Sequence, residues 1–499
     1  MEIRFENKEQ SVWREAFRQS KRSRESLESV VPDVSEDIGR VASVQSRVLL
    51  KSKDMTERGA ELTGELIVSL LYITEGEDAA ASLQLSKDFR MEFELPEHGV
   101  EAFPAAELTV LSAEARVLNP RKVAVTVELG GELRVYQQEK CTVASYLPEG
   151  DWPGLYCRVE QAEATPIRTV GEKSFAVHEQ FLFPADSPAP EKLVSQRLRL
   201  QVDEVQQIGS RSIAKGRMEL ELCYLSPEAL PCRCRFQSSF SQILESGGEN
   251  SCAVLALVQE TSAYYDLIDT IGGEKALDTE VHAVMQLISR SRETVSVITD
   301  AYSNRRPLQF ETEARSFPLA SEPQTAALSG EEKLELSEDC AQLLFAWPTL
   351  GQAVSDREAL RCNLSLELIY RTADGSLAAA RRSLELSGPR LGEDCRILSV
   401  QAGEPELKRE GTALQCKATA EVKFQKRETV ELDAISAVSA EDGADYDAAA
   451  LPGLTLVRVD DEDLWELAKR YHSSVALITE TNEQTAADPR GKLLLIPRE

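Results

Sequence analysis

The sequence predicts a mainly β protein, with three antiparallel, sandwich-like or barrel-like repeats followed by a small βααβ module. Three observations support this prediction. A strand with alternating apolar residues occurs three times, a second short motif follows each copy, and a clear helical period appears only near the C-terminus. The chain has 499 residues, which is enough for three or four domains of ordinary size.

The repeated strand occupies residues 64–72, 216–224 and 362–370, and each copy ends in a tyrosine. Large apolar residues stand at every second position, with mostly polar residues between them. Successive side chains of a strand point to opposite faces of its sheet. The alternation therefore predicts strands with one buried face and one solvent face.

The second motif closes an alternating segment and consists of a basic residue, one further residue and a Thr-Val pair. Its threonines are Thr142, Thr294 and Thr429. The first two follow the tyrosine of the repeated strand by 70 positions, and the third follows it by 59. Two ordered motifs at equal separation indicate a true repeat, and the shorter interval indicates that the third copy has lost a loop or a strand.

Stretches rich in proline, glycine and charge mark the expected boundaries between domains. At the N-terminus, Trp13, Phe17 and Ser20 have the spacing of a short amphipathic helix, which would be either a docking peptide or a frayed terminus. The expected divisions are a charged N-terminal segment (1–27), repeat 1 (28–150), a linker (151–174), repeat 2 (175–305), a linker (306–333), a shortened repeat 3 (334–440), an acidic linker (441–452) and the C-terminal module (453–499).

Composition and charge narrow the functional classes. The formal net charge is -28, and such a surface repels nucleic acid and anionic lipid. The N-terminus lacks the apolar stretch of an export signal, so the ten cysteines are expected to be reduced core residues in a cytoplasmic protein. Cys232 and Cys234 form the only close pair and lack zinc spacing, so we expect no metal and no cofactor. No apolar run is long enough for membrane insertion.

The C-terminal module is expected to contain a strand (454–459), a helix (463–472), a second helix (474–481) and a closing strand (492–496). Leu464, Leu467 and Tyr471 fall on one face of the first helix. Acidic residues precede this helix, where its dipole favours negative charge.

This order of elements, with the Leu464-Trp465 pair and the closing residues 491–497, resembles the LysM family. The resemblance implies a groove for N-acetylglucosamine polymers between two loops of the module. The usual Gly-Asp-Thr is replaced here by residues 461–463, which removes a permissive glycine and adds carboxylates that are costly to desolvate. This change favours an acidic protein-docking surface over glycan binding. The candidate partner- or glycan-binding residues are Asp461, Glu462, Asp463, Leu464, Asn482 and Glu483.

Together, the three repeats and the terminal module resemble the SPOCS-domain/LysM spore-coat morphogenetic proteins of spore-forming Firmicutes. The resemblance implies a non-enzymatic scaffold of spore envelope assembly in the mother-cell cytoplasm, at the surface of the forespore and its coat. It implies that the protein tethers coat layers through protein–protein contacts with other coat proteins. It also implies that the LysM region docks onto the coat-basement morphogenetic ATPase.

The sequence offers no catalytic motif that supports an enzyme. Only four histidines occur, and neither a His-Glu-x-x-His zinc motif nor a Gly-x-Ser-x-Gly nucleophile elbow is present. Two alternatives to the scaffold stay open at this point. One is a peptidoglycan- or cortex-binding LysM protein, and the other, less favoured, is a LysM-bearing cell-wall hydrolase.

Overall fold

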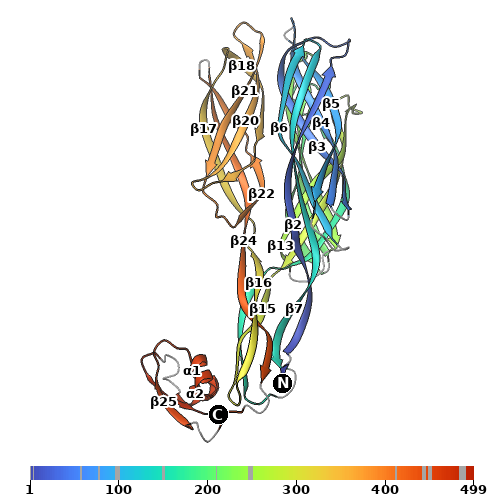
Figure 1. Ribbon diagram of the computed structural model, residues 1–499. Coiled ribbons are helices and arrows are strands. Elements are labelled where there is room, and N and C mark those ends of the chain that lie inside the picture. The colour runs from blue at the N-terminus through green and yellow to red at the C-terminus, as the bar shows by residue number, and fades with distance from the viewer. Residues whose placement is uncertain are drawn as a thin grey trace.

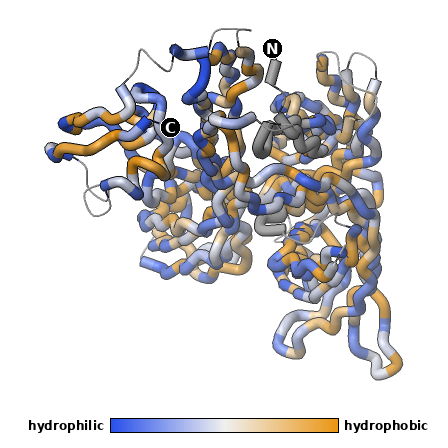
Figure 2. The backbone as a smooth tube through the Cα atoms, turned by 90° about the horizontal axis from the view of Figure 1, so that it is seen from below, coloured by the Kyte–Doolittle hydropathy of each residue, from blue (hydrophilic) through white to orange (hydrophobic). Residues whose placement is uncertain are grey.

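The computed structural model describes residues 2–3, 5–56, 59–76, 79–95, 102–148, 152–209, 211–245, 251–410, 413–440, 445–447, 452–482 and 490–498. Strands dominate these residues, and two short helices are the only helices among them. The expected mainly β class is confirmed. Figure 2 shows polar and apolar residues alternating along many strands, as in sheets that turn one face to a core.

The strands fall into three successive groups. Group 1 comprises β2 (Phe5–Val30), β3 (Ile38–Thr56), β4 (Gly59–Thr74), β5 (Ala80–Glu94), β6 (Phe103–Asn119) and β7 (Lys122–Pro148). Group 2 comprises β8 (Leu155–Ala164), β9 (Ile167–Leu182), β10 (Lys192–Ile208), β11 (Arg211–Leu225), β12 (Pro231–Glu245), β13 (Ser251–Asp269), β14 (Lys275–Ser291) and β15 (Glu293–Ser303). Group 3 comprises β16 (Leu308–Ala320), β17 (Gln324–Glu335), β18 (Cys340–Leu350), β19 (Val354–Ser355), β20 (Leu360–Thr372), β21 (Leu377–Gly388), β22 (Cys395–Ala402), β23 (Glu406–Glu410) and β24 (Ala413–Ala440). The short β1 (Glu2–Ile3) pairs with the end of β24.

Strand pairing follows one scheme in the three groups, and every pair is antiparallel. The three central strands form one sheet, as β3–β4–β5, β10–β11–β12 and β18–β20–β21. The first and last long strands pair in a second sheet, as β2 with β7, β9 with β14 and β17 with β24. The last strand also pairs with β6, β13 or β22. Groups 1 and 2 share a six-stranded sheet, whereas in group 3 an additional contact between β17 and β21 curls the sheet.

Apolar cores lie between the sheets of each group. The three expected strands, within β4, β11 and β20, supply alternate buried residues to these cores. In β4 these residues are Leu66, Val68, Leu70 and Tyr72, each no more than 1% exposed. The alternation thus identified the core face of each strand correctly, because one side of the sheet faces the opposing sheet.

The other face of these strands is also buried, which differs from the solvent face expected. Leu71 of β4, Cys223 of β11 and Ile369 of β20 meet in a further apolar cluster that joins the three groups, together with Phe345 and Trp347 of β18. Trp347 is 0% exposed. Alternation within one strand reports the residue types on each face, but it does not report contacts made by another part of the chain.

Below the body of the molecule, long strands continue into a narrow stalk (Figure 1). We define the stalk as β8, β15, β16 and residues 427–440 of β24, beside the paired ends of β2 and β7. The strand β24 runs from group 3 into the stalk, where it pairs with β16. Ile298 of β15 and Val438 of β24 belong to a small apolar core of the stalk.

Strands occupy the three segments that were expected to be a charged N-terminal segment or linkers. Residues 5–30 form β2 rather than a short helix, and the expected linkers 151–174 and 306–333 contain β8, β16 and parts of β9 and β17. These strands are polar along most of their length, so the alternation of apolar and polar residues that marks a strand is weak in them. They are held by backbone pairing with the last strand of each group, a contact far away in sequence.

The C-terminal region contains β25 (Leu454–Arg458), α1 (Leu464–Arg470), α2 (Val475–Asn482) and β26 (Leu493–Pro497). The two strands pair antiparallel. This region lies beside the lower end of the stalk (Figure 1). Its core includes Leu467 of α1, Ile478 of α2 and Leu494 of β26, each 0% exposed.

Eight cysteines lie within the described side chains, and all eight are free thiols, including Cys232 and Cys234. Five are buried, and burial raises the pKa of the Cys416 thiol to about 11. A thiol with a raised pKa is a poor nucleophile at neutral pH, which fits small core residues. Neither helix of the described chain has the length or the apolar character that crossing a bilayer requires.

Candidate functional site

The residues predicted to form the binding groove lie at two places in the C-terminal region. Asp461, Glu462, Asp463 and Leu464 occupy the connection from β25 into α1, and Asn482 ends α2. Glu483 lies outside the described residues. The acidic residues lie between β25 and α1, whereas Asn482 lies at the C-terminal end of α2.

Asp463 is already engaged within the chain. Its Oδ1 accepts a hydrogen bond from the backbone N–H of Glu466 at 2.9 Å, which caps α1. Its Oδ2 accepts from Nη1 of Arg158, a residue of β8, at 3.0 Å. Glu462 pairs with Arg470 at the other end of the helix. Asp461 and Asp463 are both exposed, and because Asp463 is engaged, Asp461 is the exposed carboxylate more open to a partner.

Asn482 joins α2 to β26. Its Nδ2 donates to the carbonyl oxygens of Ile478, at 2.8 Å, and Leu495, at 2.6 Å. Its Oδ1 accepts from the backbone N–H of Leu495 at 2.8 Å. The amide therefore satisfies both backbone groups of one strand residue, a structural role that leaves it little capacity for a ligand.

Asp300 of β15 contacts the C-terminal region, and the sequence did not predict this contact. Its carboxylate accepts from the indole Nε1 of Trp465 at 2.7 Å and from Nζ of Lys469 at 2.8 Å. Both partners lie on α1, so this carboxylate fixes the helix to the stalk. The sequence did contain a signal for a buried contact here, because Asp300 is the only charged residue between Val295 and Ser303.

Aromatic contacts extend the same interface. The ring of Tyr302 lies 5.2 Å from that of Tyr156 and 4.8 Å from that of Trp465, measured between centroids. The hydroxyl of Tyr302 donates to the carbonyl oxygen of Ser473 at 2.9 Å. Tyr302 thus lies in the core of the C-terminal region although it belongs to the stalk. One face of α1 is covered by the stalk, and the exposed surface of the region lies elsewhere.

An exposed apolar face lies on the outer side of β25 and β26. Leu454, Leu456, Leu493 and Leu495 are 40 to 60% exposed. Leu456 stands directly opposite Leu495 in the strand register. Alternate residues of paired strands share one face, so these four leucines form one patch.

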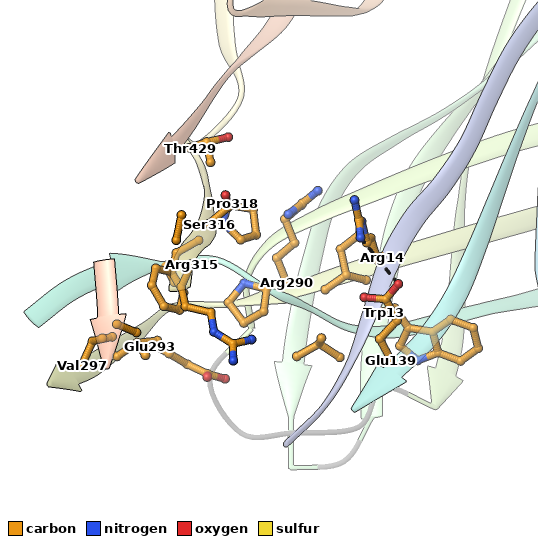
Figure 3. Close-up of a pocket in the computed structure, with 18 of the residues that line it drawn as sticks. Trp13, Arg14, Glu139, Arg290, Glu293, Val297, Arg315, Ser316, Pro318 and Thr429 are labelled. Atoms are coloured by element: carbon orange, nitrogen blue, oxygen red, sulfur yellow. Dashed lines mark ion pairs between the residues drawn. The ribbon is translucent and has the colours of Figure 1, made fainter. Parts of the chain in front are cut away.

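A cavity of about 710 Å³ lies where the body meets the stalk (Figure 3). Its walls include Trp13 on β2, Glu293 and Val297 on β15, and Pro318 on β16. Carboxylates at this cavity are held by arginines, as in the pairs of Glu139 with Arg14 at 3.7 Å and of Glu293 with Arg168.

No cluster of three or more potential metal ligands occurs among the described residues. Comparison with protein-family models, with curated proteins and with solved structures finds no match.

Proposed function

We propose that this protein is a non-enzymatic scaffold of spore envelope assembly, whose C-terminal region docks onto the coat-basement morphogenetic ATPase. The observation that carries the proposal is the combination of a large β body with a small βααβ region fixed to the end of a stalk (Figure 1). Such an arrangement separates one docking element from a broad surface, which suits the tethering of coat layers through protein–protein contacts.

The three groups of strands are best explained as copies of one SPOCS-like unit. Support comes from the pairing scheme, in which first and last strands pair and three central strands form a second sheet in each group. Further support comes from the second sequence motif. Thr142 lies on β7, Thr294 on β15 and Thr429 on β24, where each strand pairs with the first strand of its group, β2, β8 or β16.

The C-terminal region is proposed to be a LysM module specialised for protein docking. Asp463 caps α1 and binds Arg158, while Asn482 joins α2 to β26, so two of the groups expected to face a glycan have other partners. Asp461 and the outer leucine face of β25 and β26 are exposed and accessible to a protein.

Recovery of the ATPase from a sporulating lysate tests this proposal. The full chain and a chain that lacks residues 451–499 serve as matched baits. We expect the full chain to recover the ATPase and the shortened chain to lose it. Equal recovery by both chains would show that the C-terminal region is not the docking element.

The alternative of a peptidoglycan or cortex binder is tested by sedimentation with purified peptidoglycan at low salt. We expect the full chain to stay in the supernatant. Saturable co-sedimentation that disappears with residues 451–499 would favour the glycan-binding alternative. A clearing zone in zymography would indicate the hydrolase alternative and contradict a non-enzymatic scaffold.

A further inference from the structure

Several arginines converge on one carboxylate between group 1 and group 3. Oε1 of Glu132, on β7, accepts from Nε of Arg18 and from Nη2 of Arg396, both at 3.1 Å, and also from Nε of Arg134. Arg18 lies on β2 and Arg396 on β22, so the cluster connects the two groups. One carboxylate thus neutralises part of the charge of three guanidinium groups.

The nearby carboxylates do not balance the positive charge of these arginines. Oε2 of Glu15 lies 3.5 Å from Nη1 of Arg396 and 3.6 Å from Nη1 of Arg427. Glu107 lies 3.7 Å from Arg134, and burial raises the pKa of its carboxyl. Four arginines therefore share three carboxylates, and a surplus of positive charge lies inside a chain with a net charge of -28.

Arg396 has N–H groups at this place that lack a hydrogen-bond acceptor among the described residues. Its side chain is 7% exposed, and its Nε and Nη1 donate no hydrogen bond to any described residue. Burial and the neighbouring arginines lower the pKa of Arg396 to about 10. Nη1 has only the ion pair with Glu15, and a buried guanidinium whose N–H groups are not all satisfied favours an anion that can accept from them.

Arg396 and Arg18 line a pocket of about 610 Å³ at the same place. Two exposed arginines, Arg357 and Arg390, line it as well. We call this the arginine pocket, with Arg18 and Arg396 as its inner pair and the other two as its outer pair. Of its two carboxylates, Asp356 accepts from the backbone N–H groups of residues 358 and 359, and Glu393 is exposed.

We propose that the arginine pocket binds a small phosphate-bearing anion. Guanidinium groups match phosphate oxygens in geometry and charge, and the pocket has four of them against two carboxylates in its lining, Asp356 and Glu393. The volume also accommodates more than one phosphate group. Bound there, the anion would accept hydrogen bonds from the inner pair and would add a link between groups 1 and 3. This site is independent of the proposed docking by the C-terminal region.

Isothermal titration calorimetry with the full chain and inorganic pyrophosphate tests this proposal. We expect saturable binding at one site per chain at low ionic strength. The double variant Arg357→Gln and Arg390→Gln changes only exposed residues, so it should fold, and it should bind about tenfold more weakly. The matched control is Arg22→Gln, an exposed arginine on β2 whose side chain is 67% exposed, and it should bind like the wild type.

A second variant, Arg396→Gln, removes the buried donor and should abolish binding in protein that retains its wild-type circular dichroism spectrum. Absence of saturable heat with the wild-type chain would overturn the proposal. Equal affinity of the wild type and the double variant would overturn it too, because the anion would then bind elsewhere.

Discussion

Glu221 and Glu367 occupy corresponding places, each three residues before the tyrosine of the repeated strand, but their surroundings differ. Burial opposes ionisation of Glu221, yet Arg197 and Arg233 hold the pKa of this carboxyl below its ordinary value. Burial raises the pKa of Glu367, although Arg381 and neutral hydrogen-bond donors, including the hydroxyl of Ser43 at 2.6 Å, oppose this effect. The same position in groups 2 and 3 therefore carries opposite electrostatic roles.

Glutamine substitution at the two positions should give opposite dependence of stability on pH. A raised pKa means that Glu367 lowers the free energy of unfolding as the pH rises above its ordinary value of 4.5. Glu367→Gln should therefore gain stability relative to the wild type between pH 4.5 and 7. Glu221 stabilises above its ordinary pKa and loses this effect in acid, so Glu221→Gln should be destabilised at pH 7 and recover relative to the wild type below pH 4.5. Urea unfolding at each pH measures the free energy of unfolding of both variants relative to the wild type. If this difference changes with pH in the same direction for both variants, these assignments are contradicted.

Asp300 is the single residue on which contact between α1 and the stalk depends most. Asp300→Asn removes the charge that faces Lys469 and weakens the acceptor for Trp465. We expect a local loss of about 1–3 kcal/mol and faster hydrogen exchange in α1. Asp433→Asn, an exposed aspartate on β24, is the control and should leave exchange in α1 unchanged. Unaltered exchange in Asp300→Asn would show that the aromatic contacts alone fix the helix.

At the scale of elements, the hydrogen bonds of Asn482 determine how α2 meets β26. Asn482→Ala leaves the backbone N–H and carbonyl of Leu495 without their present partners. We expect the C-terminal region to lose about 1–3 kcal/mol of stability and the amide of Leu495 to exchange faster. Thr481→Ala is the control, because Thr481 bonds only the carbonyl of Leu477 within its own helix. If both variants behave alike, Asn482 has no bridging role.

Elements with strong local patterns could be predicted, and elements held by distant contacts could not. The repeated strand has a clear period of two, and it lies within β4, β11 and β20. The polar strands β2, β8 and β16 have weak periods, and they form because the last strand of each group offers a partner. The candidate site shows the same division. Residues 461–464 stay a prediction from the sequence of their own loop and helix, whereas the contact of Asp300 with α1 was missed because that helix lies more than 160 residues away.

For the whole molecule, the cluster around Trp347 makes one body from three groups of strands. The ring of Trp347 lies 5.8 Å from the ring of Phe345 and 4.5 Å from the guanidinium of Arg197, a residue of group 2. Trp347→Ala should cost about 3–5 kcal/mol, since it leaves a cavity where three groups meet. Differential scanning calorimetry should then resolve the single transition of the wild type into several. A variant that still melts in one transition would show that the groups are coupled elsewhere.

Small-angle X-ray scattering of the full chain in dilute solution tests whether the three groups form one rigid scaffold. Because the groups share a six-stranded sheet and a central apolar cluster, one conformation with the body and stalk of Figure 1 should fit the profile. Trp347→Ala should increase the radius of gyration. A wild-type profile that requires groups 1, 2 and 3 to move independently would contradict the rigid scaffold.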